Sequence, residues 1–351
     1  MNQFGWDQYA AGLSVEKLDG TARVIEELRE HYRVVAETGE FLAQISGSMR
    51  ATATSRDDYP AVGDWVSIQP DTSVGRATIH SIFPRKTKLS RKVAGRGLGE
   101  QIIAANVDVV FVVAALDQGL NLRGLERYLA LVWESGATPV VLLNKADLCS
   151  DVAQATKPVE AIISGSELVT VSALSASGLD QVQRIVTAGK TAAFIGPSGV
   201  GKSTIINGLL RSEAQLTQPV RESDDRGRHT TTSRQLFILP GGGIVIDTPG
   251  MRELQLWEAD EGLSRTFDEV ENLIAECKFG DCQHRTEPGC AVLAAIANGS
   301  LDRERLENFR KMRAEMKHGE QKSDQTAALE AKRRVKKLCK DQKRSYRSKK
   351  Y

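Results

Sequence analysis

Short runs of alternating apolar and polar residues, broken by turn-forming residues, mark the region from Tyr32 to Lys88. The runs that we expect to be strands are residues 33–36, 41–45, 65–68 and 77–82. Several short strands in so short a region are typical of a small β-barrel. An OB-fold is the leading prediction, and an SH3-like barrel would give much the same pattern. The preceding segment, Thr21 to His31, is predicted to be a helix.

From Val107 onward, apolar runs rich in β-branched residues alternate with helical stretches. The runs expected to be strands are residues 107–115, 139–143, 168–171, 192–195 and 243–247, and the helical stretches are 122–134, 179–187 and 203–210. Continuously apolar strands are typical of sheets buried on both faces. Their alternation with helices predicts an α/β domain with a largely parallel sheet and helices on both faces.

The last part of the chain has helical periodicity. Phe267, Val270 and Ile274 recur at i, i+3 and i+7, which places them on one helix face. Two more helices are predicted, at residues 291–297 and from Asp302 onward. The apolar side chains on one face of the last helix are Leu306, Phe309, Met312 and Met316. We therefore expect a mostly α C-terminal region.

Charge is distributed unevenly along the chain. The formal net charge is +2, yet residues 332–350 contain eleven Lys or Arg and one acidic residue, Asp341. Such a block is either a solvated tail or a contact for a polyanion. Met1 to Gly20 lacks the continuous apolar core of a signal peptide, and no apolar run is long enough to span a membrane. We expect a cytoplasmic protein that does not contact a membrane.

A glycine-rich segment after the predicted strand 192–195 fits the phosphate-binding pattern G-x-x-x-x-G-K-[ST]. Its residues are Gly196, Pro197, Ser198, Gly199, Val200, Gly201, Lys202 and Ser203. The glycines let the backbone point successive N–H groups at phosphate oxygens. As the catalytic lysine, Lys202 is expected to reach the β- and γ-phosphates, and the Ser203 hydroxyl to bind Mg²⁺.

A second motif, D-x-x-G, ends another predicted buried strand with Asp247 and Gly250. A carboxylate at this place can hold a water on Mg²⁺, while the Gly250 N–H can sense the γ-phosphate. The pattern is weak alone, but it gains weight because it follows a strand and lies downstream of the phosphate loop. We expect Asp247 to belong to the magnesium site.

A base-reading motif, N-K-x-D, follows the predicted strand 139–143 and consists of Asn144, Lys145, Ala146 and Asp147. An Asp there can accept hydrogen bonds from guanine N1–H and the N2 amine, donors that adenine lacks in this arrangement. The S-A-x loop expected to support the base is Ser172, Ala173 and Leu174. In Ras-like proteins N-K-x-D follows the phosphate loop, whereas here it precedes it. The motif set is therefore complete but circularly permuted.

The segment from Arg226 to Thr232 lies where a switch threonine should close over Mg²⁺. Thr231 is the favoured magnesium ligand, although Thr230 or Thr232 could serve. The place of the water-positioning glutamine of Ras-like enzymes is taken by Met251, which cannot orient water. His229 is a candidate catalytic substitute, and a surface histidine without a catalytic role is the alternative. We expect slow hydrolysis until a partner orders this segment.

Four side chains with metal-ligand chemistry are closely spaced: Cys277, Cys282, His284 and Cys290. Three thiolates and one imidazole form a closed tetrahedral set, which is typical of structural zinc. Because no coordination position is left open, we assign the site to folding rather than catalysis. Iron–sulfur ligation fits this spacing less naturally.

Taken together, these motifs resemble the RsgA (YjeQ-type) family of circularly permuted GTPases. The residues that carry the resemblance are Asn144–Asp147, Gly196–Thr204, Asp247–Gly250, 227–232 and the Cys/His set, and residues 60–66 resemble the family's N-terminal barrel. The resemblance implies a multidomain chain with an OB-fold, a permuted G domain and a zinc domain. The expected parts are 1–90 (N-terminal segment and barrel), 91–256 (G domain), 257–331 (zinc-binding helical domain) and 332–351 (basic tail).

The resemblance also implies GTP hydrolysis stimulated by the small ribosomal subunit during its late maturation. The expected partners are GTP, GDP, the small subunit and its rRNA, and the expected cofactors are one structural Zn²⁺ and Mg²⁺ bound with GTP. We expect a monomer. The alternative is an RNA-binding checkpoint protein that uses GTP as a conformational ligand with little turnover, an interpretation that Met251 leaves open.

Overall fold

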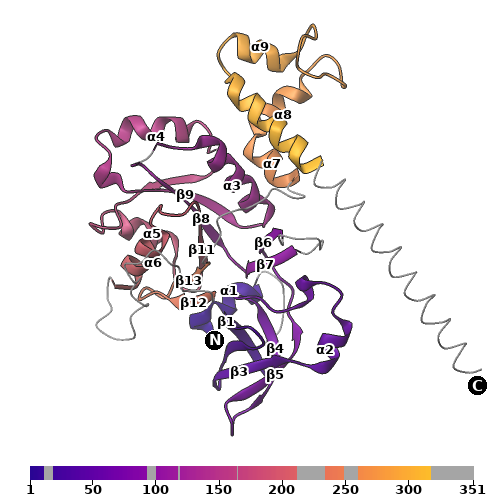
Figure 1. Cartoon of the computed structure of the whole chain (residues 1–351), viewed down its shortest axis with the longest axis vertical. Helices are drawn as coiled ribbons and strands as arrows, with labels where there is room; N and C mark the ends of the chain where they lie inside the picture. Colours follow the sequence, from indigo (N-terminus) through magenta and orange to yellow (C-terminus); the bar gives the residue numbers. More distant parts are fainter. Residues whose placement is uncertain are drawn as a thin grey trace, which may run out of the picture.

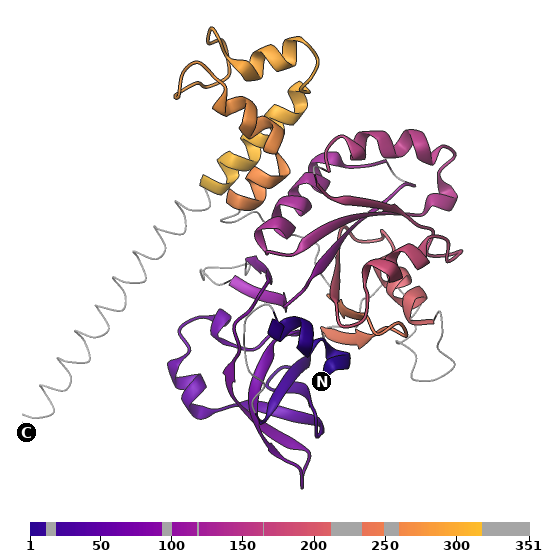
Figure 2. The same cartoon turned by 180° about the vertical axis from the view of Figure 1, so that it is seen from behind.

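The computed structural model describes residues 1–11, 19–92, 100–117, 119–163, 165–211, 234–248 and 260–317. Figures 1 and 2 show three parts in sequence order: a barrel, an α/β domain and a helical part at the opposite end of the molecule from the barrel. The predicted switch segment, Gly250, Met251 and the basic tail lie outside the described residues.

Five strands form the barrel. They are β1 (Thr21–Glu27), β2 (Tyr32–Ala36), β3 (Gly39–Ile45), β4 (Trp65–Asp71) and β5 (Arg76–Ile82), with α2 (Gly47–Thr52) and the 3-10 helix η2 (Arg56–Asp58) between β3 and β4. The strand order is β1-β2-β3-β5-β4, and β4 pairs with β1 to close the barrel. The prediction of an OB-fold, a five-stranded Greek-key barrel, is confirmed.

The prediction of a helix over Thr21–His31 is wrong, because Thr21–Glu27 is strand β1. Val24 faces the barrel core, whereas Ile25 faces the core shared with the α/β domain. A strand that is buried on both faces shows no clear alternation, so its pattern imitates a buried helix. The β-branched side chains of Thr21, Val24 and Ile25 fit the strand better.

The α/β domain contains a six-stranded part of the sheet in the order β10-β9-β8-β11-β13-β12. These strands are β8 (Val109–Ala115), β9 (Thr138–Asn144), β10 (Glu167–Thr170), β11 (Thr191–Ile195), β12 (Gln235–Ile238) and β13 (Ile244–Asp247). Neighbouring strands are parallel except for the antiparallel β12–β13 pair. The predicted, largely parallel sheet is confirmed.

Helices cover both faces of this sheet. They are α3 (Leu122–Glu134), α4 (Val152–Glu160), α5 (Leu179–Ile185) and α6 (Lys202–Arg211), whereas the 3-10 helix η3 (Ala146–Leu148) follows the end of β9. Apolar side chains of α3 and α4 pack on one face, and those of α5 and α6 pack on the other. Loops at the carboxyl ends of the parallel strands are thus left between the two helix layers, where doubly wound folds bind ligands.

The barrel and the α/β domain share one eleven-stranded sheet, because β1 pairs with β12. A separate hairpin of β6 (Lys88–Lys92) and β7 (Glu100–Ala105) connects the two parts along the chain. The N-terminal 3-10 helix η1 (Asn2–Phe4) and α1 (Trp6–Ala11) lie at the junction. Tyr9 there donates a hydrogen bond to Pro84 O (2.6 Å), and Gln8 donates one to Ala188 O (2.8 Å).

The helical part comprises α7 (Asp260–Thr266), α8 (Asp268–Ala275), α9 (Ala291–Ala297) and a last described helix over residues 303–317. Its small core includes all the apolar residues predicted for the last helix, together with Phe267 and Val270. Helix α7 contacts α3, where Gly262 N donates to Glu134 Oε2 (3.0 Å). None of the helices among the described residues is long and apolar enough to cross a membrane.

Candidate functional site

The predicted phosphate loop connects the central strand β11 to the first turn of α6 (Figure 1). Gly196 has φ 141° and Gly201 has φ 95°, conformations that L side chains rarely adopt. A Cβ on Gly196 would lie 2.2 Å from Val113 O, and one on Gly201 would lie 2.2 Å from Asn144 Nδ2. Both glycines are therefore required for the loop to lie this close to Val113 of β8 and Asn144 of β9.

Lys202 folds back over this loop. Its ammonium donates hydrogen bonds to Gly196 O (2.8 Å) and Pro197 O (2.7 Å). The exposed residues of the loop are Pro197, Ser198, Gly199 and Ser203, whereas Val200 is buried and Gly201 and Lys202 are half-buried. The loop and the Lys202 cation thus lie at the N-terminus of α6, which is an arrangement suited to binding an anion.

The described start of the D-x-x-G motif lies next to the phosphate loop, because β13 pairs in parallel with β11. Thr248 Oγ1 donates to Phe194 O (3.0 Å) and fixes this pairing. Burial raises the pKa of Asp247, and the nearby positive charge of Lys202 opposes this shift. A half-buried carboxylate beside a cation is a good candidate to face a metal–phosphate group.

The Asn144 side chain joins three of the predicted motifs. It lies buried at the end of β9, donates from Nδ2 to Val200 O in the phosphate loop (2.8 Å), and accepts at Oδ1 from Ala173 N in the S-A-x loop (3.0 Å). The two bonds, one donated by the amide nitrogen and one accepted by the amide oxygen, define the orientation of this side chain. The predicted base-reading and phosphate-binding motifs, separated in the sequence, are thereby held together.

The remaining predicted nucleotide residues divide into two groups. Asp147 and Leu174 are exposed at this edge of the sheet, whereas Ser172 is buried below them. His229, Thr231 and Gly250 lie outside the described residues, so their prediction stands as made.

Sequence analysis did not select Asp117, whose carboxylate lies 2.7 Å from the Lys145 ammonium. Its position just after the apolar strand β8 was the available signal.

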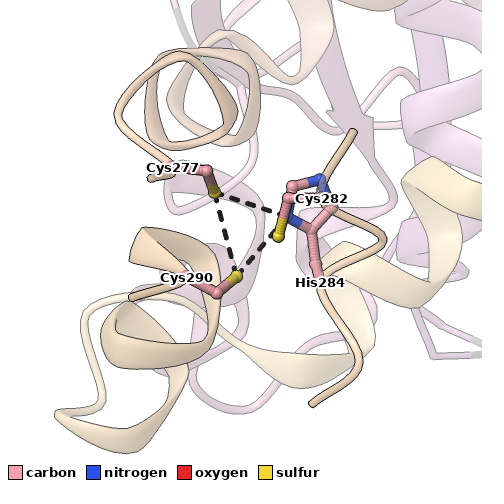
Figure 3. A group of neighbouring side chains, drawn as sticks. All are labelled: Cys277, Cys282, His284 and Cys290. Atoms are coloured by element: carbon pink, nitrogen blue, oxygen red, sulfur yellow. Dashed lines mark hydrogen bonds between the residues drawn. The ribbon is translucent and has the colours of Figure 1, made fainter. Parts of the chain in front are cut away.

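The four predicted metal ligands converge in the helical part (Figure 3). Cys277 follows α8, Cys290 caps α9, and Cys282 and His284 come from the loop between the two helices. Their ligand atoms all lie within 4.8 Å of one another. Cys277 Sγ and Cys290 Sγ are 3.8 Å apart, and His284 Nδ1 lies 3.5 Å from each. This cluster could hold a metal ion.

Two side chains, those of Arg310 and Glu287, fix the loop that carries His284. Arg310 of the last described helix donates to Gln283 O (2.7 Å) and His284 O (2.8 Å). The Glu287 carboxylate accepts from the backbone N–H groups of Gln283, Arg285 and Thr286, and such backbone bonds lower the pKa of Glu287 to about 2. The ligand set is therefore preorganised by the chain around it.

Comparison with known proteins gives concordant results. The family described as RsgA GTPase matches residues 82–257. The chain is 44% identical over 94% of both chains to the small ribosomal subunit biogenesis GTPase RsgA 1 of Oceanobacillus iheyensis. It is also 45% identical to RsgA 2 of Lactiplantibacillus plantarum over 88% of this chain and 86% of that one.

Solved structures agree with this assignment. The crystal structure of YjeQ from Thermotoga maritima aligns with a TM-score of 0.63 at 28% identity, over 83% of this chain and 96% of that one. A structure described as YloQ, a circularly permuted GTPase, has the same fold (TM-score 0.59, 24% identity, 85% of this chain and 95% of that one). The chain belongs to the RsgA GTPase family and is a GTP-hydrolysing enzyme.

Proposed function

We propose that this GTPase binds the small ribosomal subunit late in its maturation and hydrolyses GTP there to release itself. The observation that carries the proposal is the Asn144 side chain, which ties the predicted guanine-reading loop to the predicted phosphate loop in one surface site. The relatives in Oceanobacillus and Lactiplantibacillus are both named small ribosomal subunit biogenesis GTPases.

In this proposal each motif has a defined role toward GTP. The loop amides and Lys202 hold the β- and γ-phosphates, and Asp147 accepts hydrogen bonds from the guanine edge. An adenine would leave those acceptors unpaired, which is the basis of selectivity. Ser203, Asp247 and Thr231 would hold Mg²⁺, which neutralises charge on the phosphates when bound. Gly250 would sense the γ-phosphate through its N–H.

Water positioning is assigned to His229, because Met251 follows the D-x-x-G glycine where Ras-like enzymes have glutamine. An imidazole can orient a water molecule or accept a proton from it. His229→Ala should lower subunit-stimulated turnover by about 10²-fold or more, the usual range for loss of a positioned acid or base, while nucleotide affinity changes little. Unchanged stimulated turnover would assign His229 to the surface and not to catalysis.

Zinc is proposed for the Cys/His cluster. Tetrahedral zinc with bonds of about 2.3 Å to sulfur and about 2.0 Å to nitrogen requires S–S distances of about 3.8 Å and S–N distances of about 3.5 Å. The cluster has distances of 3.8 Å and 3.5 Å between these atom types. Metal analysis of the purified protein should find one zinc per chain; stoichiometric iron would contradict this assignment.

The parts of the chain divide this work. We assign RNA binding to the barrel in residues 1–90, GTP chemistry to 91–256, a zinc-stabilised fold to 257–331, and added affinity for rRNA phosphates to the basic segment 332–351. A cytoplasmic monomer is the form that we propose.

GTP turnover tests the proposal directly. The protein is assayed alone, with purified small subunits, and with large subunits as the control. We expect strong stimulation of GTP turnover by the small subunit only. Lys202→Ala should abolish this stimulation. The control variant Lys157→Ala should keep it, because the Lys157 ammonium lies outside the site and contacts Gln154 on α4. Equal, slow turnover in every mixture would favour the alternative in which GTP is only a conformational ligand.

A further inference from the structure

An ion pair joins Lys145 of the base-reading loop to Asp117, a residue that belongs to none of the predicted nucleotide motifs. Asp117 Oδ2 lies 2.7 Å from Lys145 Nζ, and the two side chains are 18% and 26% exposed. Asp117 follows the end of β8, and Lys145 follows the end of the neighbouring parallel strand β9. The pair therefore joins two strand ends at the edge of the sheet where the nucleotide motifs meet.

The backbone of Lys145 has an unusual conformation. Its φ is 62°, in the left-handed region that residues other than glycine adopt rarely and only where their surroundings enforce it. On one side Leu116 N donates to Asn144 O (3.0 Å), and on the other Ala146 N donates to Val171 O (3.1 Å). The backbone of the loop is thus fixed at both sides of Lys145, and Asp117 fixes the side chain.

We propose that Asp117 is a positioning residue for the guanine nucleotide site, acting through Lys145. This inference rests on the proposed function, namely that the loop of Asn144 and Asp147 binds guanine. Lysine has a long side chain with many rotamers, and ordering it on binding lowers affinity. By holding the ammonium before the nucleotide arrives, the Asp117 carboxylate keeps the loop in its binding conformation.

The test is nucleotide affinity of the full chain, measured by titration with fluorescently labelled GDP and a labelled non-hydrolysable GTP analogue. Asp117→Asn should raise both Kd values about two- to fivefold, in keeping with loss of one ion pair that is accessible to solvent. Asp117→Glu should restore part of the affinity. The control Asp180→Asn removes an exposed carboxylate that pairs with Arg184 at the same distance, 2.7 Å, and should change neither Kd.

Kinetics separate positioning from a general loss of structure. With small subunits present, Asp117→Asn should raise KM for GTP several-fold and leave kcat within about twofold, because only the base side of the site is altered. A fall in kcat at unchanged KM would overturn the proposal. So would a melting temperature of the nucleotide-free variant low enough to account for its weaker nucleotide binding by unfolding.

A double-mutant cycle tests the route through Lys145. In a Lys145→Gln background, Asp117→Asn should have no further effect on the Kd. If the full loss persists there, Asp117 contacts the nucleotide itself, and if Asp117→Asn binds more tightly, the pair competes with the nucleotide; either result refutes the proposal. Failure of the wild-type protein to bind labelled GDP would instead refute the proposed function.

Discussion

The α/β domain is joined to its two neighbours in physically different ways. At the barrel, the junction contains backbone pairing of β1 with β12 and a buried arginine, Arg23, that donates to Thr191 Oγ1 (2.8 Å) and to the carbonyls of Phe4 and Gly63. At the helical part, Arg305 is buried against two carboxylates, those of Glu126 on α3 and Glu269 on α8.

The two arginines respond oppositely to their surroundings. Burial lowers the pKa of Arg23 to about 10, although the charges of Asp108 and Asp64 oppose this. Burial also disfavours the charge of Arg305, but the hydrogen bonds and charges of Glu269 and Glu126 outweigh it and raise its pKa. The barrel junction therefore relies on neutral acceptors and backbone, whereas the helical junction relies on charges that need one another.

Loss of the Cys/His cluster should have the largest effect on stability, and this effect should be confined to the helical part. Cys290→Ser removes a ligand of the proposed zinc site, and structural zinc contributes about 10 kcal/mol to the folding of small domains. We expect hydrogen exchange in α8 and α9 to become fast while β1 and β12 stay protected. Cys149→Ser, which changes a cysteine outside the cluster, is the control. Equal loss of protection at the barrel junction would show that the two junctions are coupled.

Removing one charge at the helical junction should rank second. Glu126→Gln removes one of the two carboxylates that balance the buried charge of Arg305. We expect a loss of about 3 kcal/mol in the free energy that holds α7 and α8 on α3. Native-state hydrogen exchange of those helices measures it. Glu304→Gln breaks the exposed Arg123–Glu304 pair (3.5 Å) at the same junction and should cost less than about 1 kcal/mol.

Removing the buried arginine at the barrel should cost less. Arg23→Met leaves three neutral acceptors without their donor, and the β1–β12 backbone pairing remains, so we expect a loss of about 1–2 kcal/mol in the free energy of unfolding. Denaturant titration measures the loss. The control is Arg33→Met, which removes an exposed arginine that lies 3.5 Å from the Glu26 carboxylate. A larger loss than in Glu126→Gln would reverse the comparison.

The smallest effect is expected at Glu287. Because its pKa is lowered from 4.5 to about 2, its charge stabilises the His284 loop fully above pH 4.5, and this contribution disappears as the pH falls through about 2. Protection of the Arg285 and Thr286 amides, corrected for intrinsic exchange rates, should therefore be the same at pH 7 and pH 5. Glu287→Gln should lower that protection several-fold at both values, whereas Glu276→Gln should not. A decrease in protection of the wild-type amides at pH 5 would contradict the assignment.

Features that depend on local spacing were predictable from the sequence, and features that depend on distant contacts were not. The phosphate loop was predicted from residues 196–203, because its glycines, lysine and serine form a local pattern in the sequence. The Cys/His cluster is likewise local, with its ligands spread over 277–290. The Asp117–Lys145 and Glu126–Arg305 pairs span 28 and 179 residues, and no periodicity indicates either. Strand β1 was missed because both of its faces are buried.

The shared sheet also sets an order of assembly during synthesis. The barrel closes through β1 and β4, whose paired residues Thr21 and Ser67 are near in the chain. The β1–β12 pair, Glu26 with Gln235, joins residues separated by about 200 positions, so it must form late. As the chain emerges from the ribosome, a complete barrel therefore precedes its attachment to the α/β domain. That attachment waits until the phosphate loop has been translated.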